Sequence, residues 1–243
     1  MGRKGRVRLR KLRDELVRAH PSITDPDAAI GRGAVVVDGR VVSNPASLVR
    51  EGAAIALRID KPLRGEAKLG SALRAFRLAV EGRIALDVGA AAGGFTRVLL
   101  EAGARRVYAV DAGYGQLLGS LRQDPRVVNL EGTNLGELSV DLIPDQVELV
   151  TLDLSYLALA AAVPQLVAVR LAEDADAVAL VKPQFELGLA SPPQGWLQLG
   201  AAVNKATCGF RAAGWEVIGA IESPVLGARG SLEYLVHARR RRG

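Results

Sequence analysis

The chain has 243 residues, 49% of them hydrophobic, which is enough to bury a sizeable core and argues against an intrinsically disordered protein. One cysteine, Cys208, excludes an internal disulfide and a cysteine metal cluster, and the two histidines lie too far apart in sequence to suggest a metal site or a catalytic triad. We therefore expect a protein of the reducing cytoplasm that carries no metal.

The positive charge lies mainly in the first quarter of the chain. Residues 1–64 hold 14 Lys and Arg against 7 Asp and Glu, whereas the remaining residues hold 18 against 19. This asymmetry predicts a polyanionic partner held by the N-terminal region, with a solubilising arm as the alternative. The longest apolar run, residues 154–169, is broken by Pro164 and is too short for a bilayer, so we expect no membrane contact.

Residues 1–60 predict a small α+β domain. Leucines recur at helical spacing in the first segment, and an Asp38-Gly39 pair between valine runs is a strong hairpin signal. We expect, in chain order, a helix over 6–19, a short helix from a cap at Thr24 or Asp25 to Ile30, and strands over 35–37, 41–42 and 53–59.

This arrangement resembles the S4 RNA-binding module. The matching positions are Ile30, Gly33, Val35, Val37, Asp38, Gly39, Val41, Pro45, Val49, Gly52 and Ile55. The Ser-Arg pair that usually opens the second helix of that module is absent, because this segment reads Ile-Thr-Asp-Pro. The resemblance implies RNA binding through the basic residues Arg3, Lys4, Arg6, Arg8, Arg10, Lys11 and Arg32.

After a linker at 61–65, residues 66–243 alternate strands with helical runs, which predicts a parallel α/β sheet. Helices are expected between the strands, for instance over 95–102 and 157–171. The expected strands are 84–88, 106–111, 127–130, 147–153, 175–182, 215–222 and 233–238. Seven strands with interleaved helices predict one doubly wound domain.

A glycine loop follows the first of these strands in "LDVGAAAGGF". Its glycines are Gly89, Gly93 and Gly94, and Ala91 stands where the nicotinamide fingerprint needs a glycine for the pyrophosphate. Asp87 precedes the loop, and a carboxylate there suits the ammonium end of S-adenosylmethionine better than a phosphate. The pattern is typical of S-adenosylmethionine methyltransferases, a Rossmann-like fold whose last strand is antiparallel, although a glycine loop can also serve only as a tight turn.

An acidic residue ends the second strand, 22 residues after Gly89. Asp111 is placed to accept both ribose hydroxyls of a bound nucleoside, with helix capping as the alternative. Thr133 and Asn134 follow the third strand, where such folds hold the adenine. Phe95 and Asp153 complete the cofactor-binding set that we expect.

Four ionisable residues are expected at the edge of the sheet where the parallel strands end. Asp153 and Lys182 end two strands, Glu233 begins the antiparallel one, and Lys68 lies on the helix before the first strand. Each taken alone has a structural alternative, as a helix cap or a solvated side chain. Ligands bind at this edge in such sheets, so we expect the four residues to share one pocket.

This set suits methyl transfer to a hydroxyl group. The acceptor must lose its proton at the moment of transfer, and a lysine can take that proton once burial and a neighbouring cation favour its neutral form. Lys182 is the candidate base and Lys68 the second cation, while Asp153 and Glu233 would orient the two amines. A ribose 2′-hydroxyl is the natural target.

The chain resembles the TlyA/hemolysin A family, S4-linked relatives of the FtsJ-type ribosomal RNA 2′-O-methyltransferases. The resemblance is carried by "RGEAKLGSALRAF", "LDVGAAAGGFTRVLL", "DAGYGQLLGSLRQDPRV", "LDLSYLAL", "LVKPQFELG" and "SLEYL". It implies that the family's catalytic Lys-Asp-Lys-Glu set falls on Lys68, Asp153, Lys182 and Glu233. It also implies methylation of a cytidine 2′-hydroxyl in ribosomal RNA, with ribosomal subunits as partners. The segment after Gly188 departs from the family's usual glycine-rich loop.

Three other readings remain open from the sequence. The chain could be an S-adenosylmethionine- and RNA-binding protein without turnover, a haemolysin-like membrane-active protein, or a nicotinamide dehydrogenase. The complete four-residue set argues against the first, the narrow leucine stripe of the basic N-terminal helix against the second, and Ala91 against the third. The sequence names neither the modified nucleotide nor the oligomeric state.

Overall fold

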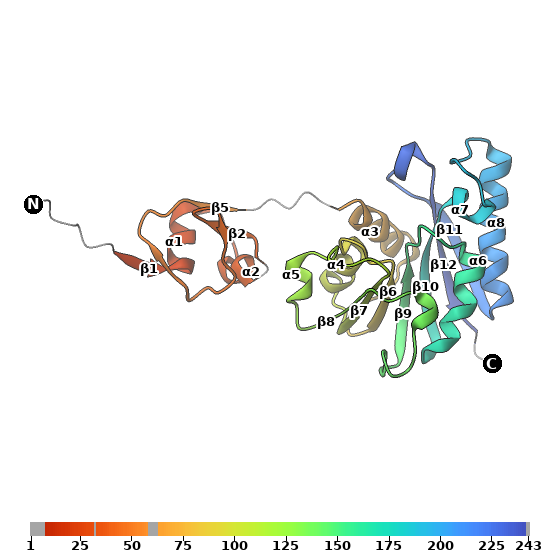
Figure 1. Ribbon diagram of the computed structural model, residues 1–243, viewed down its shortest axis with the longest axis horizontal. Helices are drawn as coiled ribbons and strands as arrows, with labels where there is room; N and C mark the ends of the chain where they lie inside the picture. The colour runs from red at the N-terminus through yellow and green to blue at the C-terminus, as the bar shows by residue number, and fades with distance from the viewer. Residues whose placement is uncertain (1–7, 32, 58–62, 242–243) are drawn as a thin grey trace, which may run out of the picture. The chain divides into compact units, whose positions relative to one another are not determined.

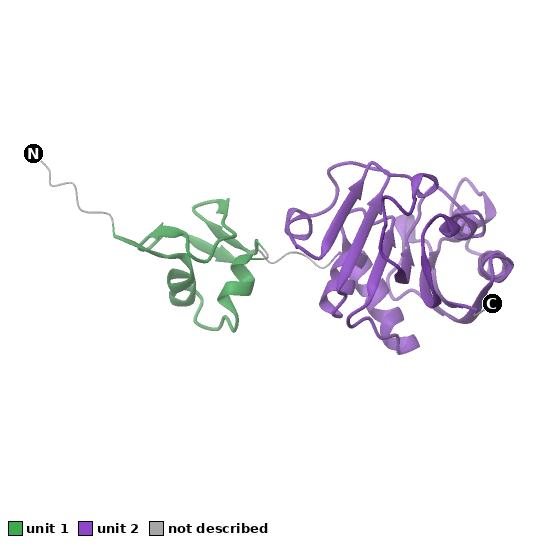
Figure 2. Ribbon diagram, turned by 90° about the horizontal axis from the view of Figure 1, so that it is seen from below, with its two compact units in different colours: residues 1–61 green, residues 62–243 purple. Residues whose placement is uncertain are grey.

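The computed structural model describes residues 8–31, 33–57 and 63–241. The chain divides into two compact units, Met1–Lys61 and Pro62–Gly243 (Figure 2). Each unit has its own buried hydrophobic residues.

The N-terminal unit combines two short helices with two small antiparallel sheets. Strand β1 pairs with β4, and β2 is the middle strand of a sheet with the order β3-β2-β5. Its core includes the fully buried Leu12, Leu16, Ile30 and Val35. The elements are β1 (Leu9–Lys11), α1 (Leu12–Ala19), α2 (Pro26–Gly31), β2 (Val35–Val37), β3 (Arg40–Val41), β4 (Leu48–Arg50) and β5 (Ile55–Leu57).

The first helix begins later than the leucine spacing predicts. Leu9 lies in β1, where it is 58% exposed and pairs with Arg50 of β4, and the helix starts only at Leu12. Strand β4 is missing from the expected elements. Residues 9–11 form their backbone hydrogen bonds with this strand, and the local periodicity of the sequence does not reveal such a distant partner. The third expected strand is observed as Ile55–Leu57, and residues 58 and 59 of that expectation lie outside the described residues.

The C-terminal unit is built on one seven-stranded sheet (Figure 1). The strand order is β11-β12-β10-β9-β6-β7-β8, and β12 runs antiparallel to both of its neighbours. This confirms the expected mostly parallel α/β sheet with an antiparallel last strand. The elements are α3 (Arg64–Phe76), β6 (Ile84–Val88), α4 (Gly94–Glu101), β7 (Arg106–Asp111), α5 (Gly119–Arg122), β8 (Val127–Glu131), β9 (Val147–Leu152), α6 (Leu159–Ala162), β10 (Leu171–Val181), α7 (Pro183–Leu187), α8 (Trp196–Ala212), β11 (Trp215–Glu222) and β12 (Tyr234–Arg240).

Helices cover both faces of this sheet. Successive residues of β10 alternate between two cores: Ala179 and Val181 join the core under α6 and α8, whereas Val178 and Leu180 join the core under α3 and α4. Because side chains alternate along a strand, a strand covered on both faces is buried at every position, as 84–88 and 175–181 are, and its residues are apolar except for Asp87 and Asp176.

One expected helix is replaced by shorter pieces. Residues 157–171 form α6, a 3-10 helix over Val163–Ala168, and the start of β10 at Leu171. Pro164 has no amide hydrogen to continue an α-helical ladder, so the helix tightens there and ends at Ala168. Strand β10 therefore begins four residues before the expected position.

Candidate active site

The sheet register brings three of the four predicted ionisable residues to one edge. Val181 of β10 pairs with Tyr234 of β12, so Lys182 and Glu233 are the next residues outward on two neighbouring strands. Asp153 directly follows β9, the other neighbour of β10, and its amide donates to the Val88 carbonyl at the end of β6. Parallel strands end together at this edge, which we call the C-terminal edge of the sheet.

Lys182 contacts two groups of the loop that follows β9. Its Nζ atom lies 2.6 Å from Asp153 Oδ1 and donates a hydrogen bond of 2.6 Å to Ser155 Oγ. The side chains of Lys182 and Asp153 are 14% and 23% exposed. The amine is therefore mostly withdrawn from water but still open on one side.

Lys68 and Glu233 form a second, more deeply buried pair. Lys68 lies on α3, and its Nζ donates to Glu233 Oε2 at 2.5 Å, with only 8% and 4% of the two side chains exposed. Charges this far from water need a partner of opposite sign, and each supplies the other. The structure thus joins the four predicted residues as two ion pairs, Lys182 with Asp153 and Lys68 with Glu233.

The glycine loop between β6 and α4 approaches the loop after β9 very closely. Gly89 has a φ of 86°, and a Cβ at this position would lie 2.5 Å from the Asp153 carbonyl oxygen. Gly94 has a different reason to be glycine, because a Cβ there would lie 3.0 Å from Gly65 Cα on α3. A side chain is excluded at Gly89 and would press against α3 at Gly94, so the glycines let the loop run past Asp153 and let α4 pack closely on α3.

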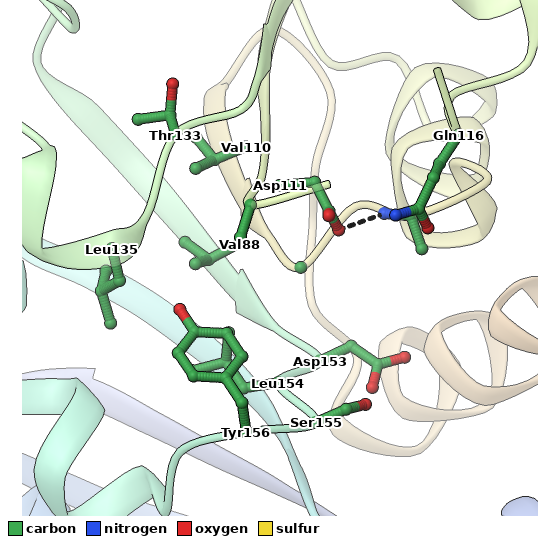
Figure 3. Close-up of a pocket in the computed structure, with 13 residues that line it drawn as sticks. Val88, Val110, Asp111, Gln116, Thr133, Leu135, Asp153, Leu154, Ser155 and Tyr156 are labelled. Carbon is green, nitrogen blue, oxygen red and sulfur yellow. Dashed lines mark hydrogen bonds between the residues drawn. The ribbon is translucent and has the colours of Figure 1, made fainter. Parts of the chain in front are cut away.

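A cavity of about 240 Å³ opens beside this loop at the C-terminal edge (Figure 3). It is lined by residues from the ends of β6 and β7 and from the segments that follow β6, β7, β8 and β9. Among the predicted residues, Gly89, Asp111, Thr133 and Asp153 line it. The complete lining is Val88, Gly89, Ala91, Val110, Asp111, Ala112, Gln116, Thr133, Leu135, Asp153, Leu154, Ser155 and Tyr156.

Asp111 is held at the mouth of the cavity by backbone amides. The Ala91 amide donates to Oδ2 at 2.8 Å, and the Gly113 amide donates to Oδ1 at 2.7 Å. A carboxylate can accept about four hydrogen bonds, so both oxygens keep capacity for hydroxyl donors of a ligand. The apolar residues Leu135 and Leu154 line the same cavity. The cavity therefore suits a ligand that has a flat apolar part next to a polar part.

Asp87 lies beneath the loop and is not among the residues that line the cavity. Its oxygens accept hydrogen bonds from the Thr96 hydroxyl at 2.6 Å and from the Thr151 hydroxyl at 2.8 Å, and it is fully buried. Burial raises the pKa of Asp87 to about 6, against the opposing effect of the two hydroxyls. In this structure Asp87 ties β6 to α4 and β9 from below.

This raised pKa predicts how stability depends on pH. An acid whose pKa is higher in the folded state stabilises the fold fully only below its ordinary pKa, here 3.8. That contribution to the free energy of unfolding disappears as the pH rises through about 6. The free energy of unfolding of the wild type should therefore fall by about 3 kcal/mol from this group between pH 3.5 and pH 7. Urea unfolding of Asp87→Asn, whose amide can still bond both hydroxyls, should lack this fall.

Asp141→Asn, which neutralises an exposed acid, is the matched control and should retain the wild-type fall. An Asp87→Asn variant that loses as much stability between the two pH values as the wild type would show that Asp87 does not carry the effect.

Other predicted cofactor residues lie outside the cavity lining. Gly93 and Gly94 belong to the turn into α4, and Phe95 is 3% exposed in the core under α3 and α4. The amide and side chain of Asn134 both donate to Glu137 in a capping box.

Of the predicted RNA-binding residues, three lie in described segments. Arg8, Arg10 and Lys11 are exposed, and Arg10 makes an ion pair of 2.9 Å with Glu51. Arg3, Lys4, Arg6 and Arg32 lie outside the described residues.

Sequence reasoning missed several lining residues, above all Ser155 and Tyr156. The available signal was their position, because they follow Asp153 directly in "LDLSYL" at the end of a buried strand. Gln116 and Leu135 had no such signal, since the loops that carry them reach the cavity only in the folded sheet.

The chain matches known proteins over nearly its whole length. The model of the FtsJ-like methyltransferase family matches residues 63–240. The 16S/23S rRNA (cytidine-2′-O)-methyltransferase TlyA of Mycobacterium tuberculosis is 42% identical over 248 residues, which cover 98% of this chain and 91% of that protein. Hemolysin A of Brachyspira hyodysenteriae is 34% identical, over 84% of this chain and 88% of that protein.

A solved structure shares the fold. The structure from Streptococcus thermophilus described as a putative hemolysin superposes with a TM-score of 0.70 at 31% identity, covering 96% of this chain and 89% of that one. Within the described ranges, no helix of the present chain is long and apolar enough to cross a membrane.

Proposed function

The chain belongs to the FtsJ-like methyltransferase family, and on this premise we propose that it transfers a methyl group from S-adenosylmethionine to a ribose 2′-hydroxyl of ribosomal RNA. The observation that carries the proposal is the partly buried Lys182 amine, 2.6 Å from Asp153, beside a cavity at the C-terminal edge. The target nucleoside is cytidine, supported by the 42% identity to a cytidine-2′-O-methyltransferase.

The residues around the cavity fit S-adenosylmethionine. Asp111 would accept hydrogen bonds from the ribose hydroxyls, the backbone of Gly89 lines the cavity, and Thr133 with Leu135 would flank the adenine. When bound, this cofactor supplies a methyl group on a sulfonium that leaves as a neutral thioether. The leaving group therefore needs no acid, and the protein's own residues act on the acceptor.

Lys182 would take the proton of the acceptor hydroxyl. Its amine is withdrawn from water, is held by Asp153 and lies on the sheet edge next to Glu233. Asp153 would fix the amine in place, while the Lys68–Glu233 pair contributes a second cation and a balancing acid. Asp153 lines the cavity and pairs with Lys182, and the strand register places Glu233 next to Lys182, which supports one shared site.

The N-terminal unit would hold the RNA. Residues 1–64 carry a twofold excess of basic over acidic side chains, and Arg8, Arg10 and Lys11 are exposed on or beside β1. Phosphate contacts by such residues bind without sequence preference and place the protein on its substrate. On this proposal the unit acts as an S4-like anchor for ribosomal RNA in the cytoplasm.

Removing residues 1–60 should weaken binding to ribosomal RNA and flatten its salt dependence. Each lost phosphate contact lowers the slope of log Kd against log salt by roughly one. Binding is measured by filter retention between 50 and 300 mM salt, and the full-length triple variant Arg8→Ala, Arg10→Ala, Lys11→Ala is the point-mutant control. Equal affinity and slope for truncated and full-length protein would show that this unit is not an anchor.

The proposed activity is tested by incubating the purified protein with S-adenosylmethionine, labelled in its methyl group, and unmodified ribosomal subunits. Digestion to nucleosides should place the label in 2′-O-methylcytidine. Label on a base, or in no nucleoside although cofactor and RNA both bind, would favour a base methyltransferase or a binding protein without turnover.

A further inference from the structure

Ser155 lies between the cofactor cavity and the Lys182 amine. It belongs to the loop after β9, two residues beyond Asp153, and it lines the cavity together with Tyr156. Its Oγ accepts a hydrogen bond of 2.6 Å from Lys182 Nζ. No other residue that lines the cavity donates to or accepts from this amine by a hydrogen bond in the described part of the chain.

The contact with Asp153 does not replace this hydrogen bond. Asp153 Oδ1 is 2.6 Å from Nζ, yet within the described residues this buried oxygen has no partner with hydrogen-bond geometry. The carboxylate therefore holds the amine by charge, and the hydrogen bond to Ser155 Oγ adds a directional contact. Charge without alignment holds a flexible lysine close but does not orient it.

Orientation matters because a neutral amine has only one lone pair and two N–H bonds. If one N–H points to Ser155 Oγ and Asp153 attracts the other, the lone pair remains for the acceptor hydroxyl. The proton then moves from the ribose oxygen to Nζ as the oxygen–methyl bond forms and the sulfur–methyl bond breaks. The contacts with Ser155 and Asp153 persist throughout, so no reorganisation is needed.

We infer that Ser155 is a positioning residue of the active site, whose hydroxyl aims the Lys182 amine at the acceptor hydroxyl of the RNA. The inference rests on the proposed ribose methylation. It assigns Ser155 neither to the cofactor nor to proton transfer, although the residue lines the cavity.

The test compares Ser155→Ala and Ser155→Thr with the wild-type full chain on ribosomal subunits. Loss of a hydrogen bond to a charged group predicts a kcat for Ser155→Ala lower by roughly ten- to a hundred-fold. The KM for RNA and the Kd for S-adenosylmethionine should stay within about threefold. Ser155→Thr keeps the hydroxyl and should recover most of the rate. Ser139→Ala, outside the cavity lining, is the hydroxyl-deletion control.

A second readout separates positioning from a merely structural role. The hydroxyl stabilises the charged amine by accepting its hydrogen bond, so without it the acidic limb of the kcat profile should move to lower pH. A loop that is only loosened would lower kcat at every pH and leave the limb in place. Measured Kd values for S-adenosylmethionine show whether each variant is folded.

Three outcomes would overturn the inference while wild-type methylation stands. They are an unchanged kcat in Ser155→Ala, a loss in Ser155→Thr as large as in Ser155→Ala, and an acidic limb that does not move. A wild type that methylates no ribose would instead refute the proposed function, so the two failures are distinguishable.

Discussion

Replacement of Lys182 by alanine is expected to abolish methyl transfer to ribosomal RNA while S-adenosylmethionine affinity stays within a few-fold. The amine is the group placed to take the acceptor's proton, and loss of a general base costs roughly a hundred- to ten-thousand-fold in rate. Lys182 itself does not line the cavity, so cofactor binding should survive. Single-turnover methylation and calorimetric titration of the cofactor measure the two effects.

Lys182→Arg is the matched variant for this prediction. A guanidinium preserves the positive charge beside Asp153 but does not lose its proton in a protein, so it cannot act as a base. It should be as inactive as the alanine variant if proton transfer is the role of Lys182. Near-wild-type turnover in either variant would remove Lys182 from the chemistry.

Among single substitutions of the four ionisable residues, Glu233→Ala should produce the largest loss of stability. It would leave the Lys68 ammonium, 8% exposed, without the carboxylate that lies 2.5 Å away. Breaking a buried pair from one side costs about 3–5 kcal/mol, because the remaining charge stays out of water. The free energy of unfolding is measured by urea denaturation of the full-length protein.

The double variant Lys68→Met, Glu233→Leu separates stability from catalysis. Removing both charges leaves no buried ion unpaired, so the unfolding free energy should return to within about 1–2 kcal/mol of the wild type. Methyl transfer should remain low if the pair serves the reaction. Full activity in a stable double variant would make the pair purely structural.

The strands of the C-terminal unit could be predicted from the sequence because the patterns that identify them are local. A strand covered on both faces is almost entirely apolar, so 84–88, in which only Asp87 is polar, and the end of β10 could be recognised without tertiary information. Asp153 and Lys182 stand where such strands end, and parallel strands end at one edge. Their proximity therefore followed from topology alone.

Contacts that depend on register or on loop paths could not be predicted. Which lysine pairs with which acid is decided by the alignment of β10 with β12 and by the position of α3 over that edge. Strand β4 needs β1 as its partner, and Ser155 reaches Lys182 only because the chain turns back after β9. Asp87 was expected at the cofactor, but its two hydroxyl partners lie on α4 and β9.

Methylation of ribosomal RNA by this protein in cells is tested by a ribose-methylation map of ribosomal RNA from a strain that lacks it. We predict that at least one 2′-O-methylcytidine present in the parent strain is missing and returns on complementation with the wild type but not with Lys182→Ala. Identical maps from the parent and deletion strains would contradict the account.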